Sequence, residues 1–106
     1  MEKKNSNGIN GLATLLQSEI VNDFNNNNLK VYKCGTFPGN LAKYRVVDFH
    51  PATENNSLLR SSAYVQYFST LDWAMRCDHG YTKYLGGFAV VYEKSGRSWN
   101  PIQVIA

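Results

Sequence analysis

Residues 9–24 carry apolar side chains three and four positions apart, which is the spacing of one face of an α-helix. The stripe is formed by Ile9, Leu12, Leu16, Ile20 and Phe24. A single apolar stripe cannot be buried within its own helix, so it must pack against another part of the chain. Because the segments that follow have the shorter period of strands, we expect an N-terminal helix, capped at Asn10, that packs on a sheet.

Two strands are expected after this helix, at about residues 29–35 and 41–49. Pro38 and Gly39 lie between them, and proline presets the first position of a turn while glycine accepts a positive φ at the second. Pro51 cannot donate a hydrogen bond to a sheet and therefore ends the second strand. The pattern predicts a β-hairpin in which these two strands pair with each other.

A third strand and a second helix are expected in the middle of the chain. Residues 59–68 alternate in polarity and are rich in aromatic side chains, which is typical of a strand. Ser69 and Asp72 stand three positions apart like the two ends of a capping box, so Ser69 is the expected N-cap of a short helix. That helix is expected to end at Gly80, and residues 81–87 are expected to form a loop.

The C-terminal part of the chain predicts two further strands. Residues 88–93 combine β-branched and aromatic side chains, and a short strand near residues 102–105 follows Pro101, which places it at a sheet edge. The element order is therefore α-β-β-β-α-β-β. We predict an α+β fold in which a mainly antiparallel sheet of four to five strands is covered on one face by an N-terminal helix and a short second helix.

The length of 106 residues fits one domain, which is expected to span residues 9–106 behind a disordered or frayed tail of residues 1–8. The chain has two cysteines, Cys34 and Cys77, whereas secreted domains that depend on disulfides usually have about four or more, so both are expected to be reduced thiols. No apolar run approaches the roughly 18 residues of a membrane span. The sequence thus predicts a cytoplasmic protein without a membrane partner.

Residues 29–47 of the predicted hairpin contain four positive side chains and no acidic one, although the net charge of the chain is only +3. A turn with an even number of residues places Tyr32 opposite Arg45, and one face then displays Lys30, Tyr32, Lys43 and Arg45. A turn with an odd number moves Tyr32 to the apolar face but leaves Lys33 with Lys43 and Arg45. Either register predicts a positive surface, and the same pattern is also typical of a solvated sheet face that is kept polar.

Cys77 and His79 can act as a nucleophile and its base only if their side chains meet. Residues two positions apart on a helix point in directions about 200° apart, so these two meet only if the helix ends between them. We therefore expect Cys77 to be a buried structural residue. Asp48 and His50 share one face of a strand, a spacing that can orient a histidine for acid–base work. Two histidines and two cysteines without C-x2-C spacing do not predict zinc, and no catalytic residue, metal or cofactor is expected.

A small domain that is rich in Tyr, Trp and Arg and lacks a catalytic set predicts a non-enzymatic protein-binding module. Such a module would act as an inhibitor or an accessory regulator that occupies a surface of its protein partner. The predicted binding surface combines basic residues with aromatic residues of the types that anchor interfaces: Lys30, Tyr32, Lys43, Arg45, Lys83, Tyr84, Arg97 and Trp99.

Two alternative functions remain open at this level. The first is single-stranded nucleic-acid binding, in which three aromatic residues stack on bases and three basic residues contact phosphates. The aromatic residues are Tyr32, Phe37 and Tyr84, and the basic residues are Lys30, Lys43 and Arg45. The second is enzymatic activity, which depends on whether Asp48, His50, Cys77 and His79 converge in space.

Overall fold

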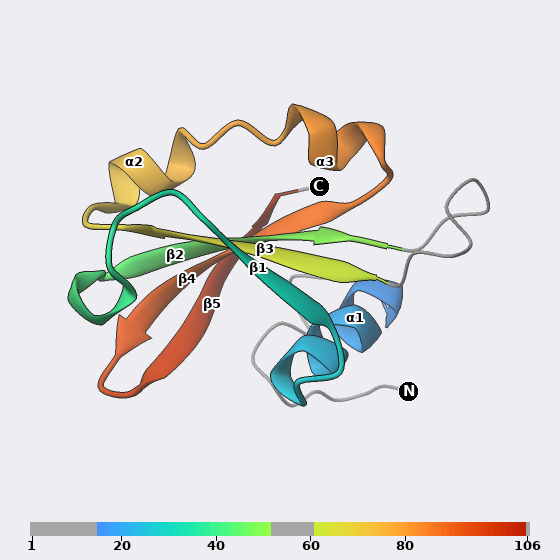
Figure 1. Cartoon of the computed structure of the whole chain (residues 1–106), viewed down its shortest axis with the longest axis horizontal. Coiled ribbons are helices and arrows are strands. Elements are labelled where there is room, and N and C mark those ends of the chain that lie inside the picture. Colours follow the sequence, from blue (N-terminus) through green and yellow to red (C-terminus); the bar gives the residue numbers. More distant parts are fainter. Residues whose placement is uncertain (1–14, 52–60, 106) are drawn as a thin grey trace.

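The computed structural model describes residues 15–51 and 61–105 of the chain (Figure 1). It confirms the predicted α+β fold, with an N-terminal helix, a five-stranded, mostly antiparallel sheet and one bent helical connection between the third and fourth strands. The elements in chain order are α1 (Leu15–Asn25), β1 (Lys30–Cys34), η1 (Gly39–Leu41), β2 (Tyr44–His50), β3 (Ser62–Phe68), α2 (Leu71–Met75), α3 (Gly80–Tyr84), β4 (Phe88–Ser95) and β5 (Ser98–Ile105).

The predicted N-terminal helix is present as α1. It ends in the asparagine run, where Asn28 N–H donates to the carbonyl of Asp23 at 2.8 Å and Asn27 adopts a left-handed φ of 61°. Asparagine tolerates this conformation better than most residues, which explains why the helix ends there. The predicted start at residue 9, the N-cap Asn10 and the tail of residues 1–8 lie outside the described residues.

The predicted hairpin is wrong, although both of its strands form. The strand order is β1-β3-β2-β4-β5, so β3 lies between the two strands that were expected to pair. β1 runs parallel to β3, and the other neighbouring strands are antiparallel. Pro38 and Gly39 do not close a hairpin, because they open the short 3-10 helix η1, in which Leu41 N–H donates to the carbonyl of Pro38. Gly39 packs so closely on Tyr67 that a Cβ there would lie 2.9 Å from the ring.

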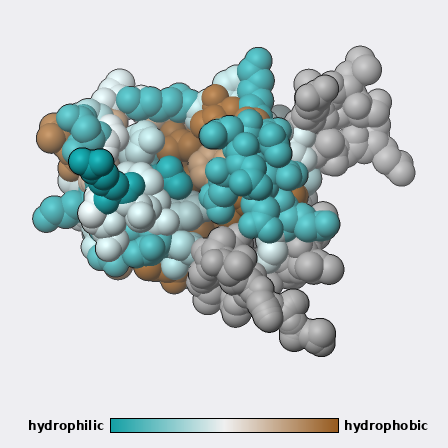
Figure 2. Space-filling model, turned by 90° about the horizontal axis from the view of Figure 1, so that it is seen from below, coloured by the Kyte–Doolittle hydropathy of each residue, from teal (hydrophilic) through white to brown (hydrophobic). Residues whose placement is uncertain are grey.

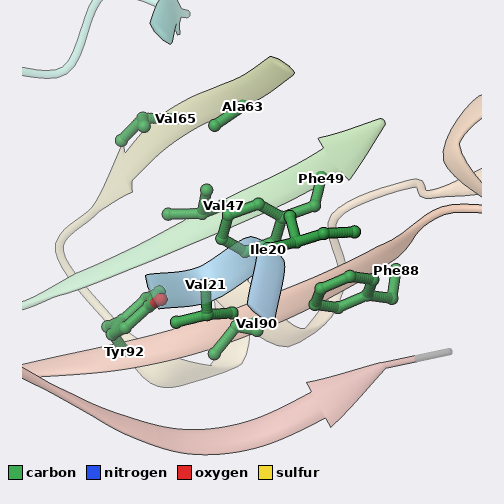
Figure 3. Close-up of a cluster of buried hydrophobic side chains, with 9 residues drawn as sticks. All are labelled: Ile20, Val21, Val47, Phe49, Ala63, Val65, Phe88, Val90 and Tyr92. Atoms are coloured by element: carbon green, nitrogen blue, oxygen red, sulfur yellow. The ribbon is translucent and has the colours of Figure 1, made fainter. Parts of the chain in front are cut away.

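The sheet has helices on both faces, whereas the sequence predicted helices on one (Figure 1). Figure 3 shows the core that α1 forms with β2, β3 and β4 on the first face. Its buried members are Ile20, Val21, Val47, Phe49, Ala63, Val65, Phe88, Val90 and Tyr92. The described residues present a mostly hydrophilic surface on this side of the molecule, with smaller apolar patches between them (Figure 2). The opposite face carries α2 and α3 over a smaller buried cluster of Val46, Ala74, Ala89 and Val91.

The connection between β3 and β4 differs from the predicted single helix. The N-cap of α2 is Thr70, one residue later than expected, and its hydroxyl accepts a hydrogen bond from Trp73 N–H at 3.3 Å. The helix ends at Met75 and does not reach Gly80. A second short helix, α3, occupies most of the predicted loop and begins where the Asp78 carboxylate accepts from Gly80 N–H at 2.9 Å. A side chain that captures a backbone donor competes with a continuing helix, which explains the bend.

β5 lies at a sheet edge, as Pro101 predicted, but it is longer than expected and spans Ser98–Ile105. Pro101 pairs with Tyr92 at a shift in register between Val91 and Tyr92. An edge strand tolerates the missing donor of proline, and the irregularity accommodates it within the pair.

Arg45 lies on the α1 face, where its guanidinium packs against aromatic rings. The guanidinium carbon is 5.3 Å from the ring centre of Phe24, 4.5 Å from that of Tyr92 and 4.9 Å from that of Trp99. Burial lowers the pKa of Arg45, and burial also raises the pKa of Tyr92 to about 12, although the nearby Arg45 charge opposes that rise. Arg45 is therefore part of the packing beneath the sheet and not a freely exposed cation.

The raised pKa of Tyr92 makes stability depend on alkaline pH. Its contribution is fully present below the ordinary tyrosine pKa near 10 and is lost as the pH rises toward 12, because the unfolded chain releases this proton first. We expect the Tyr92→Phe variant to lack this loss, which amounts to at most about 2–3 kcal/mol of the free energy of unfolding. Chemical denaturation between about pH 9 and 11.5 measures it. Tyr84→Phe, at a tyrosine that is 83% exposed, is the control, and equal pH slopes for all three proteins would contradict the expectation.

Candidate functional site

The candidate site is a pocket of about 270 Å³ on the α2–α3 face of the sheet. Three strands and the bent connection supply its walls. The lining residues are Cys34 from β1, Asp48 and His50 from β2, Tyr64 and Gln66 from β3, and Cys77, Asp78, Tyr81 and Thr82 from the connection and α3.

Strand alternation and register place the sheet residues of this pocket. Asp48 and His50 are two positions apart on β2, so their side chains project from the same face. Tyr64 of β3 pairs with Asp48 on one side and with Tyr32 of β1 on the other. The three strands therefore bring a carboxylate and two tyrosines into one row beneath α3.

Asp48 is the centre of a hydrogen-bond network between β2 and α3. Its Oδ2 accepts from His79 Nδ1 at 2.8 Å and from the Thr82 hydroxyl. Thr82 Oγ1 also lies 2.9 Å from His50 Nε2. A threonine hydroxyl has one proton and gives it here to the carboxylate, so His50 Nε2–H must donate to Thr82. The order of donors is thus His50 to Thr82 to Asp48, with His79 donating from the other side.

This order of donors determines which ring nitrogen of His50 carries a proton. Burial lowers the pKa of His50 below its ordinary value of 6.5, although the Asp48 charge opposes that change. His50 is therefore neutral at pH 7, and because Nε2 carries the proton, Nδ1 has a lone pair that accepts hydrogen bonds.

The side chain of His79 is more deeply buried than that of His50. Its side chain is 7% exposed and donates from Nδ1 to Asp48, while Nε2 is buried and has no hydrogen-bond partner among the described residues. The bend after Met75 places His79 outside α2, and this allows its ring to reach the sheet. His79 thereby fastens the connection to β2.

Gly87 allows α3 to lie directly on β2. Its N–H donates to the carbonyl of Thr82 at 2.8 Å, and a Cβ at this position would lie 2.1 Å from the carbonyl oxygen of Phe49. No residue with a side chain fits there without moving the helix from the strand. The glycine therefore maintains the short approach that brings Thr82 to Asp48.

Both cysteines line the pocket as free, half-buried thiols. Cys77 Sγ lies 3.5 Å from Gln66 Oε1, to which its thiol donates. Burial raises the pKa of Cys77, and the negative charges of Asp48 and Asp78 raise it further. A thiol with a raised pKa is a poor nucleophile at neutral pH, and Cys77 is half-buried, not fully buried as the sequence predicted.

A row of neighbouring aromatic rings leads from the edge of the sheet across the pocket: Tyr32 stacks on Tyr64 and Tyr81 stacks on Tyr84, whereas His50 is tilted against Tyr64 and meets Tyr81 edge-on. We define this aromatic row as Tyr32, Tyr64, His50, Tyr81 and Tyr84. Successive ring centres are 4.8, 4.6, 5.7 and 6.3 Å apart. The last two tyrosines are 68% and 83% exposed, so the row ends in solvent beside the pocket.

The predicted binding surface does not form one patch. Tyr32 and Lys30 lie on the pocket face of β1, with the Lys30 ammonium 5.8 Å from the Tyr32 ring centre, and Lys83 and Tyr84 lie on α3. Arg45 and Trp99 pack together on the opposite face. Lys43 precedes β2 and Arg97 stands in the turn between β4 and β5. The predicted hairpin placed Lys30, Tyr32, Lys43 and Arg45 on one face. Its absence separates Arg45 from Lys30 and Tyr32, because β1 and β2 each pair with β3 in a register of their own.

The convergence that the sequence left open is present. Asp48, His50 and His79 belong to one network, and Cys77 lines the same pocket. Sequence reasoning did not identify the hydrogen-bonding role of Thr82, which connects His50 to Asp48, because the contacts of a segment predicted to be a loop do not follow from its spacing. For Tyr64 and Gln66, the sequence predicted only a position on the third strand and no role in a site.

In the part of the chain that the structure describes, no group of three or more His, Cys, Asp or Glu residues is arranged to hold a metal ion. The helices described here are too short or too polar to cross a membrane. The chain matches no protein-family model, no curated protein and no solved structure.

Thr82→Val tests the network directly. The valine fills a similar volume but neither donates to Asp48 nor accepts from His50, and a partly buried polar group without its partner costs about 1–3 kcal/mol. We expect the free energy of unfolding in urea to fall by this amount. Thr82→Ser keeps the hydroxyl and should lie closer to the wild type. Equal stability of the valine variant and the wild type would show that the network contributes nothing.

Proposed function

We propose that this protein is a non-enzymatic binding module that holds a partner protein against the aromatic row and the adjoining pocket. The observation that carries the proposal is the exposed end of the row, where Tyr81 and Tyr84 stack on each other in solvent. Tyrosine offers a large contact area and loses little conformational entropy on binding. Occupying a partner in this way would make the protein an inhibitor or an accessory regulator.

The inner end of the row supports the same proposal. Tyr32, Tyr64 and His50 are packed against one another and against the sheet, so they form a preorganised base for the two exposed rings. A contact surface that is ordered before binding loses less entropy when the partner docks. The pocket beside the row offers a concave position for an anchoring side chain.

Single-stranded nucleic acid remains the alternative partner, but the charges near the row favour it less. Asp48 and Asp78 line the pocket, and no lysine or arginine is among its lining residues in the described part of the chain. Lys30 and Lys83 are the cations of the predicted surface that stand on this side. The carboxylates would therefore repel the phosphate groups that the lysines attract. A protein partner can instead place basic groups near the carboxylates and acidic groups near the lysines.

Selection from a displayed library of random peptides tests the proposal with a defined probe. We expect peptides whose affinity, measured by fluorescence polarisation, falls about tenfold or more in a Tyr81→Ser/Tyr84→Ser variant, because anchoring tyrosines carry much of the binding energy. Trp73→Ser is the matched control, since Trp73 is 60% exposed on α2 and lies outside the row. Circular dichroism verifies that each variant is folded.

Two results would contradict this proposal. The first is a set of selected peptides that bind the double variant as tightly as the wild type. The second is tight binding of an oligothymidylate, with a steep salt dependence, by a protein that selects no peptide, which would favour the nucleic-acid alternative.

A second candidate function is acid–base catalysis, and one observation favours it. The free Nδ1 of neutral His50 can accept a proton from a molecule in the pocket, and the positive charge would then be stabilised by Asp48 through Thr82. The partly buried Asp48 is in turn fixed by His79. This arrangement provides a base and a group that orients it, but the pocket contains no activated nucleophile.

Hydrolysis of p-nitrophenyl acetate is a simple probe of this second candidate. Catalysis by His50 should increase with pH through its lowered pKa, below 6.5, and His50→Gln should reduce the rate about 100-fold. A rate that is the same in the wild type and in His50→Gln would exclude His50 as a base for this ester.

A further inference from the structure

We propose that the pocket binds the guanidinium group of an arginine side chain from the partner protein. This inference rests on the proposed binding function and names the group that its pocket receives. Three features of the pocket carry it: the sign of its charge, the direction of its hydrogen bonds and the aromatic rings in its walls.

The charge of the lining favours a cation. Asp48 and Asp78 are both lining residues, and the lining that residues 15–51 and 61–105 supply includes no lysine or arginine. Asp48 is 16% exposed at its side chain, whereas Asp78 is exposed near the bend of the connection. A cation that enters the pocket would therefore meet one carboxylate in a sheltered position and one at the surface, where the interaction is weaker.

The direction of the hydrogen bonds favours a ligand that donates. Asp48 can only accept, and the order of the network leaves Nδ1 of His50 as an acceptor. Gln66 Oε1 accepts from Cys77 and can accept a second hydrogen bond. A guanidinium group has five N–H donors and no acceptor, so it is complementary to this set.

The aromatic rings select arginine over lysine. Tyr64 and Tyr81 line the pocket on either side of His50, and planar guanidinium groups stack on such rings while they donate to carboxylates. The protein uses the same interaction on its other face, where Arg45 packs on the rings of Phe24, Tyr92 and Trp99. An ammonium group is more strongly hydrated and lacks the planar fork.

Titration of the protein with N-acetylarginine N-methylamide, followed by amide NMR shifts, tests this site. We expect shifts that saturate in β2 near Asp48 and His50 and in α3 near Tyr81 and Thr82. The citrulline analogue has nearly the same shape but no charge and should cause no comparable shifts. Equal shifts from both compounds, or shifts confined to other elements, would overturn the inference.

Asp78→Asn is the variant for the same titration, because asparagine can still accept the hydrogen bond from Gly80 and the fold is expected to remain intact. Loss of one exposed carboxylate should weaken binding about fivefold. Asp72→Asn, an exposed acid on α2 paired with Arg76, is the matched control and should bind as the wild type does. Equal affinities of the wild type and Asp78→Asn would exclude Asp78 from the site.

Peptides from the library selection separate this inference from the proposed function. Replacement of an arginine by citrulline in a selected peptide should lower its affinity about tenfold, as expected for the loss of a charged hydrogen-bonded anchor. If the peptides depend on Tyr81 and Tyr84 but contain no arginine, or tolerate citrulline, the arginine pocket is wrong and the binding module stands. If no peptide depends on these tyrosines, the proposed function fails by itself.

Discussion

The partly buried carboxylate of Asp48 is the interaction on which the pocket face depends. Removing a charge from water costs several kcal/mol unless hydrogen-bond donors replace the lost water. His79 and Thr82 supply those donors. His79 lies directly before α3, and Thr82 lies within it. The same hydrogen bonds that compensate the charge therefore hold the bent connection on the sheet.

The two faces of the sheet differ in how completely they are covered. On the α1 face, large side chains such as Phe49, Phe88 and Tyr92 form a continuous core with the helix. On the other face the buried cluster contains two alanines and two valines, and the short helices contribute one residue to it, Ala74. Apolar contact alone provides less stabilisation here, so polar contacts have a larger share. A face that is incompletely covered is also the face that retains a pocket and exposed tyrosines.

The pocket and the aromatic row are products of the same arrangement. The network orients His50, and the His50 ring lies between Tyr64 and Tyr81 in the row. A partner that docks on the row would therefore contact a ring whose orientation and protonation are set by Thr82 and Asp48. For this reason the proposed binding function and the alternative acid–base function involve the same residues. The direction of the hydrogen bonds matters for both proposals.

The sequence by itself determined most of the local elements and which side chains within one strand share a face, but not the two short helices between β3 and β4. Helical spacing identified α1, alternation identified β3, Pro101 indicated the edge position of β5, and the two-residue spacing placed Asp48 beside His50. These features depend on backbone geometry within a few residues. The tertiary structure alone decided that β3 separates β1 from β2, that Thr82 joins His50 to Asp48, and that His79 bonds to Asp48 directly. Strand order and such contacts depend on which distant segments bury each other best. A local turn signal such as Pro38-Gly39 contains no information about this long-range pairing.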